Sequence, residues 1–152
     1  MRMITAIAAL TLGTASIATA QESLNAAQAE QKMRNYLSTW EGNEGSWANA
    51  VNTYYAPQVV YYGKEMTRSQ VLADKLRFHR SYPRRSYTIA PGSLRTGCNG
   101  PTCMARAELR WGRTGVSGRR ENGASDLRLV FSRGDGGRII RESARTLWTS
   151  KR

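Results

Sequence analysis

The stretch VVYYGKEMTRSQVLADK, residues 59–75, contains the junction on which the fold depends. It begins with an apolar and aromatic run, turns at Gly63 and enters a helical pattern within a few residues. Thr67 and Gln70 match a capping box, in which each side chain accepts a hydrogen bond from the backbone N–H of the other residue. We therefore predict a short strand over residues 59–62 and a helix that begins directly after Thr67.

The helix after this junction is predicted to lie against the core along one face. Met66 and Val71 occupy the two positions of a hydrophobic staple, which fixes the angle at which the chain enters a helix. Pro83 would end the helix because proline lacks the backbone N–H and clashes with the preceding turn. The side chains predicted to face inward are Val71, Leu72, Lys75, Leu76, His79 and Tyr82.

Two further helices are expected before this junction. Ser23 can cap the first, and the EGNEG segment at residues 41–45 interrupts its pattern. Ser46 can cap the second, which Pro57 would end. Apolar residues recur at three- and four-residue spacing in both helices. They are Leu24, Met33, Tyr36, Leu37 and Trp40 in the first helix and Trp47, Ala50, Val51 and Tyr54 in the second.

The second half of the chain changes to the alternating pattern of strands. In residues 105–111, alanine, leucine and tryptophan alternate with arginine and glutamate, so one sheet face would be buried and the other rich in arginine. Glycine-rich turns, such as GDGGR at residues 134–138, separate the runs. Helices followed by an antiparallel meander indicate an α+β domain. The predicted strands cover residues 85–89, 104–111, 125–131 and 138–148.

The N-terminal segment, residues 1–20, has the composition of a secretory signal peptide. Arg2 precedes an apolar run of small residues, and the Ala-Thr-Ala sequence that ends at Ala20 fits a small-x-small cleavage site. The run is short for a membrane span, and several threonines dilute it. We therefore expect cleavage after Ala20, a periplasmic location, and a single domain over residues 21–152 with no transmembrane segment.

Positive charge is concentrated in the second half of the chain. The formal net charge at pH 7 is +12. Residues 21–82 contain 7 basic and 6 acidic residues, whereas residues 83–152 contain 15 basic and 5 acidic residues. Most of these basic residues are arginine, whose guanidinium group suits phosphate and carboxylate partners. The alternative is that the arginines supply solvated charge without any specific partner.

The sequence contains two cysteines, Cys98 and Cys103, on either side of an Asn-Gly-Pro-Thr turn. In an exported protein this spacing favours a disulfide that staples the turn. A metal site would need more ligands than the single histidine, His79, can add, and a redox pair usually has two residues between its cysteines. We therefore predict a structural disulfide, no metal and no cofactor.

The order of elements resembles the nuclear-transport-factor-2-like (NTF2-like, or SnoaL-like) superfamily, in which N-terminal helices pack on a curved antiparallel sheet to form a cone. The segments YYAPQVVYYGKEMTRSQVLADK and RSYPRRSYTIAPGSLR are similar to a small exported domain of this superfamily, common in alphaproteobacteria. In some proteins that domain follows a caspase-like peptidase domain. The motif likeness covers residues 47–95, and residues 98–147 share only the strand pattern. The resemblance implies a fold rather than one function.

Enzymes of this superfamily, such as ketosteroid isomerases, scytalone dehydratases and limonene epoxide hydrolases, react inside the cone. They place an Asp, His or Tyr there, with a pKa that burial adjusts. In this chain Asp74, Lys75 and His79 are the weak catalytic candidates, and positions 75 and 79 share one helix face. Glu142, in the last predicted strand, could face either way. Hydroxyl groups could come from Tyr55, Tyr61, Tyr62 and Tyr87.

These candidates do not define a catalytic set. A lone histidine on a helix is usually a packed structural residue, and Asp74 followed by Lys75 is typical of an ion pair or a solvated face. The sequence contains no nucleophile elbow, no phosphate-binding glycine loop and no cluster of metal ligands. The residues predicted to contact a small ligand are Tyr62, Lys64, Lys75, His79 and Tyr87.

The exposed sheet face is the second predicted site. Arg106, Arg110, Arg128 and Arg141 would lie across it and could bind an anion or an acidic envelope partner. Nucleic acid is disfavoured, because Trp148 is the only aromatic residue expected to be exposed near these arginines for base stacking and the protein is predicted to be exported. We expect a monomer or a homodimer.

Together these features predict an exported, non-catalytic module of the cell envelope that binds a small ligand or another protein. One alternative is a small lyase or isomerase that acts inside the cone through His79, Asp74 or a tyrosine. The other is an electrostatic binder of anionic envelope polymers. An enzyme should show polar groups that converge in a closed pocket, whereas a polyanion binder should lose affinity steeply as salt increases.

Overall fold

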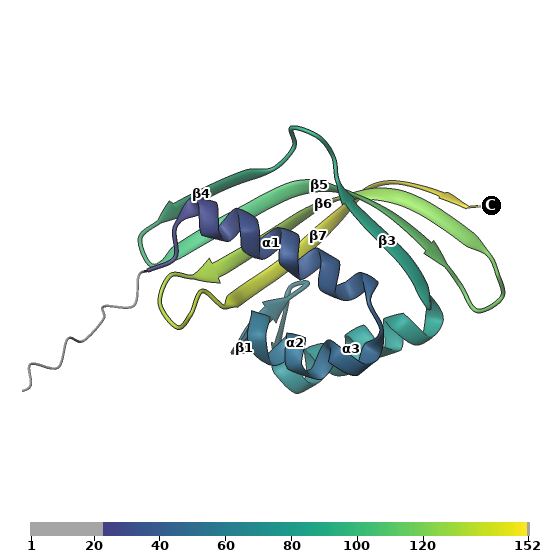
Figure 1. Cartoon of the computed structure of the whole chain (residues 1–152), viewed down its shortest axis with the longest axis horizontal. Helices are drawn as coiled ribbons and strands as arrows, with labels where there is room; N and C mark the ends of the chain where they lie inside the picture. The colour runs from purple at the N-terminus through teal and green to yellow at the C-terminus, as the bar shows by residue number, and fades with distance from the viewer. Residues whose placement is uncertain (1–22, 152) are drawn as a thin grey trace, which may run out of the picture.

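The computed structural model describes residues 23–151 of the chain. Within this range three α-helices pack against a single seven-stranded sheet, in the α+β order that the sequence predicts (Figure 1). The predicted signal peptide, residues 1–20, lies outside the described residues. Among residues 23–151, none of the helices combines the length and the apolar character needed to cross a bilayer.

Helix α1, Ala26–Glu41, is capped by Asn25 rather than by the predicted Ser23. The Asn25 side chain accepts a hydrogen bond from the Gln28 N–H, and the Gln28 side chain accepts one from the Asn25 N–H, both at 2.9 Å. Because this capping box satisfies donors that the start of a helix leaves unpaired, it fixes the boundary.

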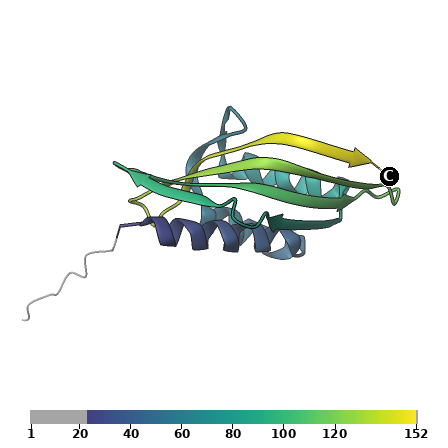
Figure 2. The ribbon, with the colours of Figure 1, turned by 90° about the horizontal axis from the view of Figure 1, so that it is seen from above.

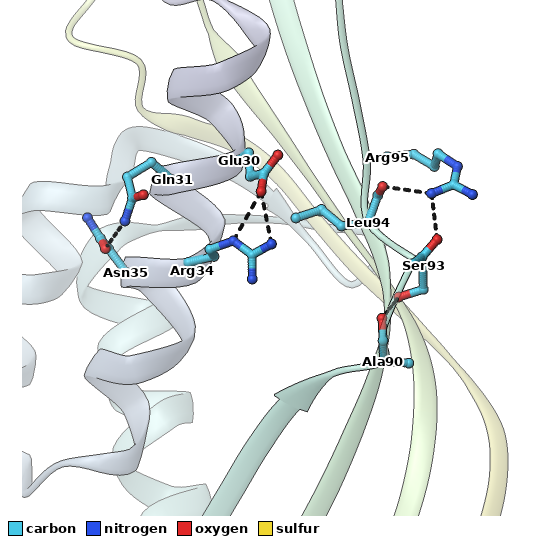
Figure 3. Close-up of polar contacts among 9 residues, drawn as sticks. Glu30, Gln31, Arg34, Asn35, Ala90, Ser93, Leu94 and Arg95 are labelled. Atoms are coloured by element: carbon cyan, nitrogen blue, oxygen red, sulfur yellow. Dashed lines mark hydrogen bonds and ion pairs between the residues drawn. The ribbon is translucent and has the colours of Figure 1, made fainter.

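The solvent side of α1 carries pairs of polar residues one turn apart. Arg34 donates to Glu30 at 2.9 Å, and Gln31 donates to Asn35 at 2.8 Å (Figure 3). Exposed pairs of this kind stabilise a helix by only about 0.3–0.5 kcal/mol each. The opposite side of α1 faces the core, where it buries Ala29, Met33, Tyr36, Leu37 and Trp40.

A 3-10 turn, Glu44–Ser46, leads into helix α2, Trp47–Tyr54. This helix ends before the predicted stop at Pro57, because the chain passes directly into a strand at Tyr55. Helix α3, Arg68–Ser81, begins at the predicted capping box, and both of its side-chain hydrogen bonds are formed.

The sheet has the strand order β2-β1-β7-β6-β5-β3, and β4 also pairs with β5. All pairs are antiparallel, as predicted, except β1 and β7, which are parallel. The two shortest strands, β2 and β4, were missed by the sequence prediction. The strands are β1 Tyr55–Tyr61, β2 Lys64–Thr67, β3 Arg84–Ile89, β4 Arg95–Asn99, β5 Thr102–Thr114, β6 Arg120–Ser132 and β7 Ile139–Lys151.

A corner between β3 and β4 bends one edge of the sheet, since β3 pairs with the second half of β5 and β4 with its first half. The Ser93 hydroxyl donates to the Ala90 carbonyl at 2.7 Å, and Arg95 donates to the Leu94 carbonyl at 2.9 Å (Figure 3). These local hydrogen bonds stabilise the corner, which contains no helix.

The helices cover one face of the sheet. In Figure 2 the long strands β5, β6 and β7 cross the view with no helix in front of them, and α3 lies behind them. The core therefore lies between the helices and the concave face. Its fully buried side chains include Met33, Val51, Val71, Leu129, Phe131 and Ile139.

The predicted disulfide between Cys98 and Cys103 is present. The two residues are directly opposite each other in β4 and β5, so the bond closes the hairpin that these strands form. Cys103 is buried in the core, and the disulfide therefore ties the tip of this hairpin to packed structure.

Candidate functional site

A cavity of about 470 Å³ lies between the helices and the concave face of the sheet. Its volume falls within the range of small-molecule sites, roughly 300–1,000 Å³. Most of the lining is apolar or aromatic, and α1, α2, α3 and the long strands all contribute to it. The aromatic residues of the lining are Tyr36, Trp40, Trp47, Tyr61, Tyr62, Phe78, Tyr87 and Trp111.

A buried carboxylate, Glu142 on β7, lies in this lining and is only 2% exposed. It accepts hydrogen bonds from the hydroxyl of Tyr36 at 2.8 Å, from that of Tyr62 at 3.2 Å and from that of Tyr55. The Lys75 ammonium lies 3.7 Å from it. We call these five residues the Glu142 cluster. Their hydrogen bonds and the nearby cation offset the cost of removing the carboxylate from water.

A β-bulge in β7 turns Glu142 inward. Phe131 of β6 pairs with Ile139, but its neighbour Val130 pairs with Arg141, so Ile140 is an extra residue in the ladder. Strict alternation from the buried Ile139 would have placed Arg141 inside and Glu142 outside. Because one inserted residue reverses the alternation, the bulge aims the carboxylate into the cavity and the arginine into solvent.

The hairpin turn at Tyr62 and Gly63 brings a hydroxyl to the same carboxylate. Both residues have positive φ, 48° and 81°, as the central residues of a type I′ hairpin turn do. This conformation is uncommon for a tyrosine and costs about 1–2 kcal/mol. Tyr62 nevertheless bonds Glu142 twice, through its N–H to the backbone carbonyl at 2.9 Å and through its hydroxyl. The strained turn therefore positions that hydroxyl.

Lys75 on α3 completes the cluster and is almost buried, with 12% of its side chain exposed. Its ammonium donates to the Tyr36 hydroxyl at 3.0 Å and lies 4.5 Å from the ring centre of Trp40. Burial lowers the pKa of Lys75, and the negative charge of Glu142 opposes that shift. Lys75 is thus a buried cation held by one carboxylate, one hydroxyl and the rings of four aromatic residues, Tyr36, Trp40, Tyr55 and Tyr61.

The tyrosines of the cluster act as hydrogen-bond donors. Burial raises the pKa values of Tyr36 and Tyr55 well above the ordinary value, and the charge of Glu142 raises them further. These two hydroxyls therefore stay neutral over the whole physiological pH range.

The sequence matches no protein-family model and no curated protein. Its structure is similar to that of a provisionally named NTF2-like dehydratase from Streptomyces avermitilis (TM-score 0.67, 13% identity, covering 80% of this chain and 96% of that one). This chain has the NTF2-like fold.

Two other solved structures share this fold. One is a provisionally named aromatic ring hydroxylase from Novosphingobium aromaticivorans, with a TM-score of 0.69 and 12% identity over 81% of this chain and 90% of the other. The second is a type 2 hexachlorocyclohexane dehydrochlorinase, with a TM-score of 0.64 and 11% identity over 82% and 86%. At these identities the likeness establishes the fold alone.

The NTF2-like cone brings some of the predicted ligand-contacting residues together. Tyr62, Lys75 and Tyr87 line the cavity, as does Asp74, which pairs with Arg77 at 3.3 Å. These four residues come from β1–β2, α3 and β3, so the cone gathers side chains that are distant in the sequence.

His79 and Lys64 lie outside the cavity lining. The His79 ring packs edge-on against Trp47, with 5.0 Å between ring centres, and its Nδ1 lies 2.7 Å from a guanidinium nitrogen of Arg85. Lys64 is exposed on β2. The polar pair expected at positions 75 and 79 is therefore separated, although both residues lie on the inner side of α3.

Arg85 has a bracing role in the cone. It donates to the Trp40 carbonyl at 2.8 Å and to the Tyr82 carbonyl at 2.6 Å. These bonds join the end of α1 to the end of α3, and the guanidinium also lies 5.0 Å from the Trp47 ring centre. Burial lowers the pKa of Arg85.

Sequence reasoning missed Tyr36 of the Glu142 cluster and the contact between Trp40 and Lys75. Tyr36 and Trp40 recur at core spacing in α1, so the pattern predicted packing and gave no sign of a polar contact. Glu142 was left with either orientation open. A pattern of residues cannot show the bulge at Ile140, which decides that orientation.

The four predicted arginines lie on the opposite, exposed face of the sheet. Arg106 and Arg128 are directly opposite each other on β5 and β6. Acidic neighbours offset part of this charge, since Arg106 pairs with Asp126 at 2.6 Å and Arg110 with Glu108 at 3.4 Å. Arg141 lies further along the same face on β7.

Within residues 23–151, no three His, Cys, Asp or Glu side chains lie close enough together to hold a metal ion. The chemistry available in the cavity is that of ammonium, guanidinium, carboxylate, hydroxyl and indole groups.

Proposed function

We propose that the protein binds a small, mainly apolar molecule in the cavity of the cone and holds the polar end of that molecule at the Glu142 cluster. The size and aromatic lining of the cavity support this function. The observation that carries it is the buried Lys75–Glu142 pair in the cavity wall.

Stability alone does not account for this pair. Replacing a buried ion pair with apolar residues of similar volume is often neutral or stabilising, by about 1–4 kcal/mol. Charged groups that a fold does not need for stability, and that line a cavity, are candidates for contacting a ligand. This is the reason to assign Lys75 and Glu142 to binding.

A lyase or isomerase is the second candidate function. Hydrogen bonds connect Lys75, Tyr36, Tyr55 and Glu142, so a proton could pass between a bound molecule and this network. Solved structures with the same fold include one named a dehydrochlorinase. Turnover of a bound molecule, followed by NMR or mass spectrometry, would separate the enzyme from a binding protein.

The location of the protein stays a prediction. The disulfide between Cys98 and Cys103 supports export, because such bonds persist in oxidising compartments. We therefore propose that the ligand is bound in the periplasm.

Binding can be tested with two variants of adjacent residues on β7. Ala144 lines the cavity, whereas Ser143 is opposite Arg128 on the other face. Ala144→Phe should fill the cavity, and Ser143→Phe should leave it open. Planar aromatic carboxylates, ketones and hydrocarbons would be titrated into the mature protein while the indole N–H resonances are followed by NMR.

The wild type and Ser143→Phe should show the same saturable shifts for Trp40, Trp47 and Trp111, and Ala144→Phe should show none. Trp148 is exposed and lies outside the cavity, so its resonance is an internal control. The proposed function is wrong if no probe shifts the indole resonances of Trp40, Trp47 and Trp111, or if the Ala144→Phe variant binds the probes as tightly as the wild type.

A further inference from the structure

The second half of β7 is a free edge of the sheet. Register pairs between β1 and β7 end at Glu142, and within residues 23–151 no strand pairs with that side of residues 143–151. In Figure 2 this part of β7, coloured yellow, is the outermost of the long strands. We propose that this edge binds a short acidic segment of another protein, which joins the sheet as an additional strand. The inference does not depend on what the cavity binds.

The side chains of this edge are exposed on both faces of the strand. Gly123 and Ser125 of β6 are buried, whereas their partners on β7, Thr149 and Thr146, are exposed, and so are all of residues 145–151. A strand with one packed face would bury every second side chain. Nothing in the described part of the chain therefore shields this edge from a partner. Thr146 and Thr149 also line the cavity, so an added strand would extend its wall.

The backbone of an edge strand determines what kind of molecule can complete it. About every second residue directs its N–H and C=O groups away from the sheet, and an extended peptide satisfies such a row by strand addition. A lipid bilayer does not, because hydrocarbon offers an open sheet edge no hydrogen-bond partners. The outer strand β3 differs from β7, since its Tyr87 N–H donates to Glu41 of α1 at 2.6 Å. The free edge of β7 thus favours a peptide strand.

Two large apolar side chains lie in the middle of the free edge. Leu147 is 43% exposed and Trp148 is 51% exposed. Thr146 pairs with Ser125 and Trp148 with Ala124, so Leu147 is an extra residue in the ladder. A strand beside β7 would cover part of both side chains, and cross-strand apolar pairs contribute about 0.2–1 kcal/mol each. The partner strand would therefore gain apolar contacts in addition to backbone hydrogen bonds.

The charge of the free edge favours an acidic partner. Residues 143–151 contain two basic residues, Arg145 and Lys151, and no acidic residue. Asp126 lies 4.0 Å from Arg145, but it already forms a closer ion pair, at 2.6 Å, with another arginine. Glu121, opposite Lys151, likewise pairs with another arginine at 2.6 Å. Both cations are therefore available to acidic side chains of a partner strand.

A second copy of this chain is the other strand that the edge could pair with. Each copy has a formal net charge of +12, and pairing of two such edges would bring Arg145 and Lys151 of both copies to one seam. Charged side chains and bulges, such as the bulge at Leu147, are features by which sheets avoid edge-to-edge pairing. Repulsion therefore opposes self-pairing, whereas an acidic strand would neutralise the same charges.

A fluorescently labelled peptide of alternating glutamate and valine, about seven residues long, tests this inference. Its binding to the mature protein would be measured by fluorescence anisotropy, and amide hydrogen exchange of residues 143–151 would be followed by NMR. One control peptide has lysine in place of glutamate. The other is N-methylated along its backbone, which keeps the charge but removes the N–H donors. We expect saturable binding of the acidic peptide, slower exchange in residues 143–151, and at least about tenfold weaker binding of each control.

Two charge reversals on β7 test where the peptide binds. Arg145→Glu changes the free edge, whereas Arg141→Glu changes an exposed arginine in the part of the strand that β1 covers. Arg145→Glu should weaken binding of the acidic peptide about fivefold or more, and Arg141→Glu should weaken it less than about twofold. Equal losses would mean that the peptide responds only to the overall charge of the open face, and they would overturn the edge assignment.

The remaining outcomes are equally decisive. If the N-methylated peptide binds as tightly as the acidic peptide, or if no peptide binds, strand addition is wrong. If the lysine peptide binds as tightly, the acidic partner is wrong. Sedimentation of the protein alone would reveal a second copy at the edge, as a dimer in which the amides of residues 143–151 are protected without any peptide. That result would overturn the proposed occupant.

Discussion

The two faces of this sheet both carry charge, but they use it in different ways. At the concave face Glu142 of β7 and the facing Lys75 of α3 are nearly buried, and hydroxyl groups surround the carboxylate. On the open face Arg106 and its neighbours lie in solvent and form ion pairs at the surface. Buried charges are costly to separate, whereas exposed pairs contribute about 0–1 kcal/mol. The few charges in the cone therefore matter more than the many outside it.

The net charge of the chain does not show where its most constrained charged groups lie. Most of the excess arginine of the chain belongs to the second half, and the four arginines singled out there all face solvent. The cavity contains only a few ionisable groups, and the sequence spreads them from α1 to β7. Composition thus drew attention to the open face, although the concave face holds the more constrained chemistry.

The largest effect is expected for Glu142→Gln. This change leaves the Lys75 ammonium buried without its counter-ion, which should lower the free energy of unfolding by about 3–5 kcal/mol. Urea unfolding monitored by circular dichroism would measure it. The control, Glu108→Gln on the open face, should cost less than about 1 kcal/mol. Equal losses for the two variants would mean that burial does not distinguish the faces.

A smaller effect is expected for Tyr62→Phe. The variant keeps the turn and the ring but removes the hydroxyl that donates to Glu142. Hydrogen bonds to charged groups contribute about 1.5–3 kcal/mol, and the partly exposed position of Tyr62 places it at the lower end of this range. Tyr82→Phe, which removes a hydroxyl outside the cluster, is the control. No loss in Tyr62→Phe would show that the strained turn does not serve the carboxylate.

Lowering the pH should remove a stabilising contribution on the open face, because it protonates Asp126. The hydrogen bond from Arg106 holds the pKa of Asp126 below its ordinary value of 3.8. Because the folded pKa is the lower one, this stabilising contribution is complete above about pH 3.8 and is lost as the pH falls through the folded pKa. Thermal unfolding of Asp126→Asn between pH 2 and 6 should show a weaker dependence on pH than the wild type. An unchanged slope would contradict the pairing.

The smallest effect is expected for Arg128→Ala. Arg128 is exposed and directly opposite Arg106, so its removal relieves repulsion between like charges while breaking no ion pair that the described residues form. The free energy of unfolding should change by less than about 0.5 kcal/mol, and binding of the planar aromatic carboxylate 2-naphthoate in the cavity should not change. A loss comparable to that of Glu142→Gln would contradict the contrast between the faces.

Features set by neighbouring residues could be read from the sequence. The capping box of Thr67 and Gln70 and the disulfide of Cys98 and Cys103 involve residues at most five positions apart, and both are present. The order of helices and strands followed from periodicity in the same way. Local chemistry therefore predicted the α+β order of helices and strands and the disulfide, whereas the cone was implied by the resemblance to the NTF2-like superfamily.

The site could be predicted only in part, because its geometry depends on distant segments. Lys75 was identified from its place on the inner side of α3, but the bulge at Ile140 determines whether Glu142 meets it. His79 shares that helix side, yet one turn further along it meets Trp47 and Arg85 instead of the cavity. Helical periodicity predicts on which side of the helix a side chain lies, but it does not show how far the cavity extends along that helix.

The double variant Lys75→Met/Glu142→Gln tests most directly whether the buried pair exists for binding. With both charges removed, most of the stability lost in Glu142→Gln should return, to within about 1 kcal/mol of the wild type. Its affinity for 2-naphthoate should nevertheless fall at least about tenfold, because the ammonium donor is gone. A stable double variant that binds 2-naphthoate as tightly as the wild type would contradict the role proposed for the Glu142 cluster.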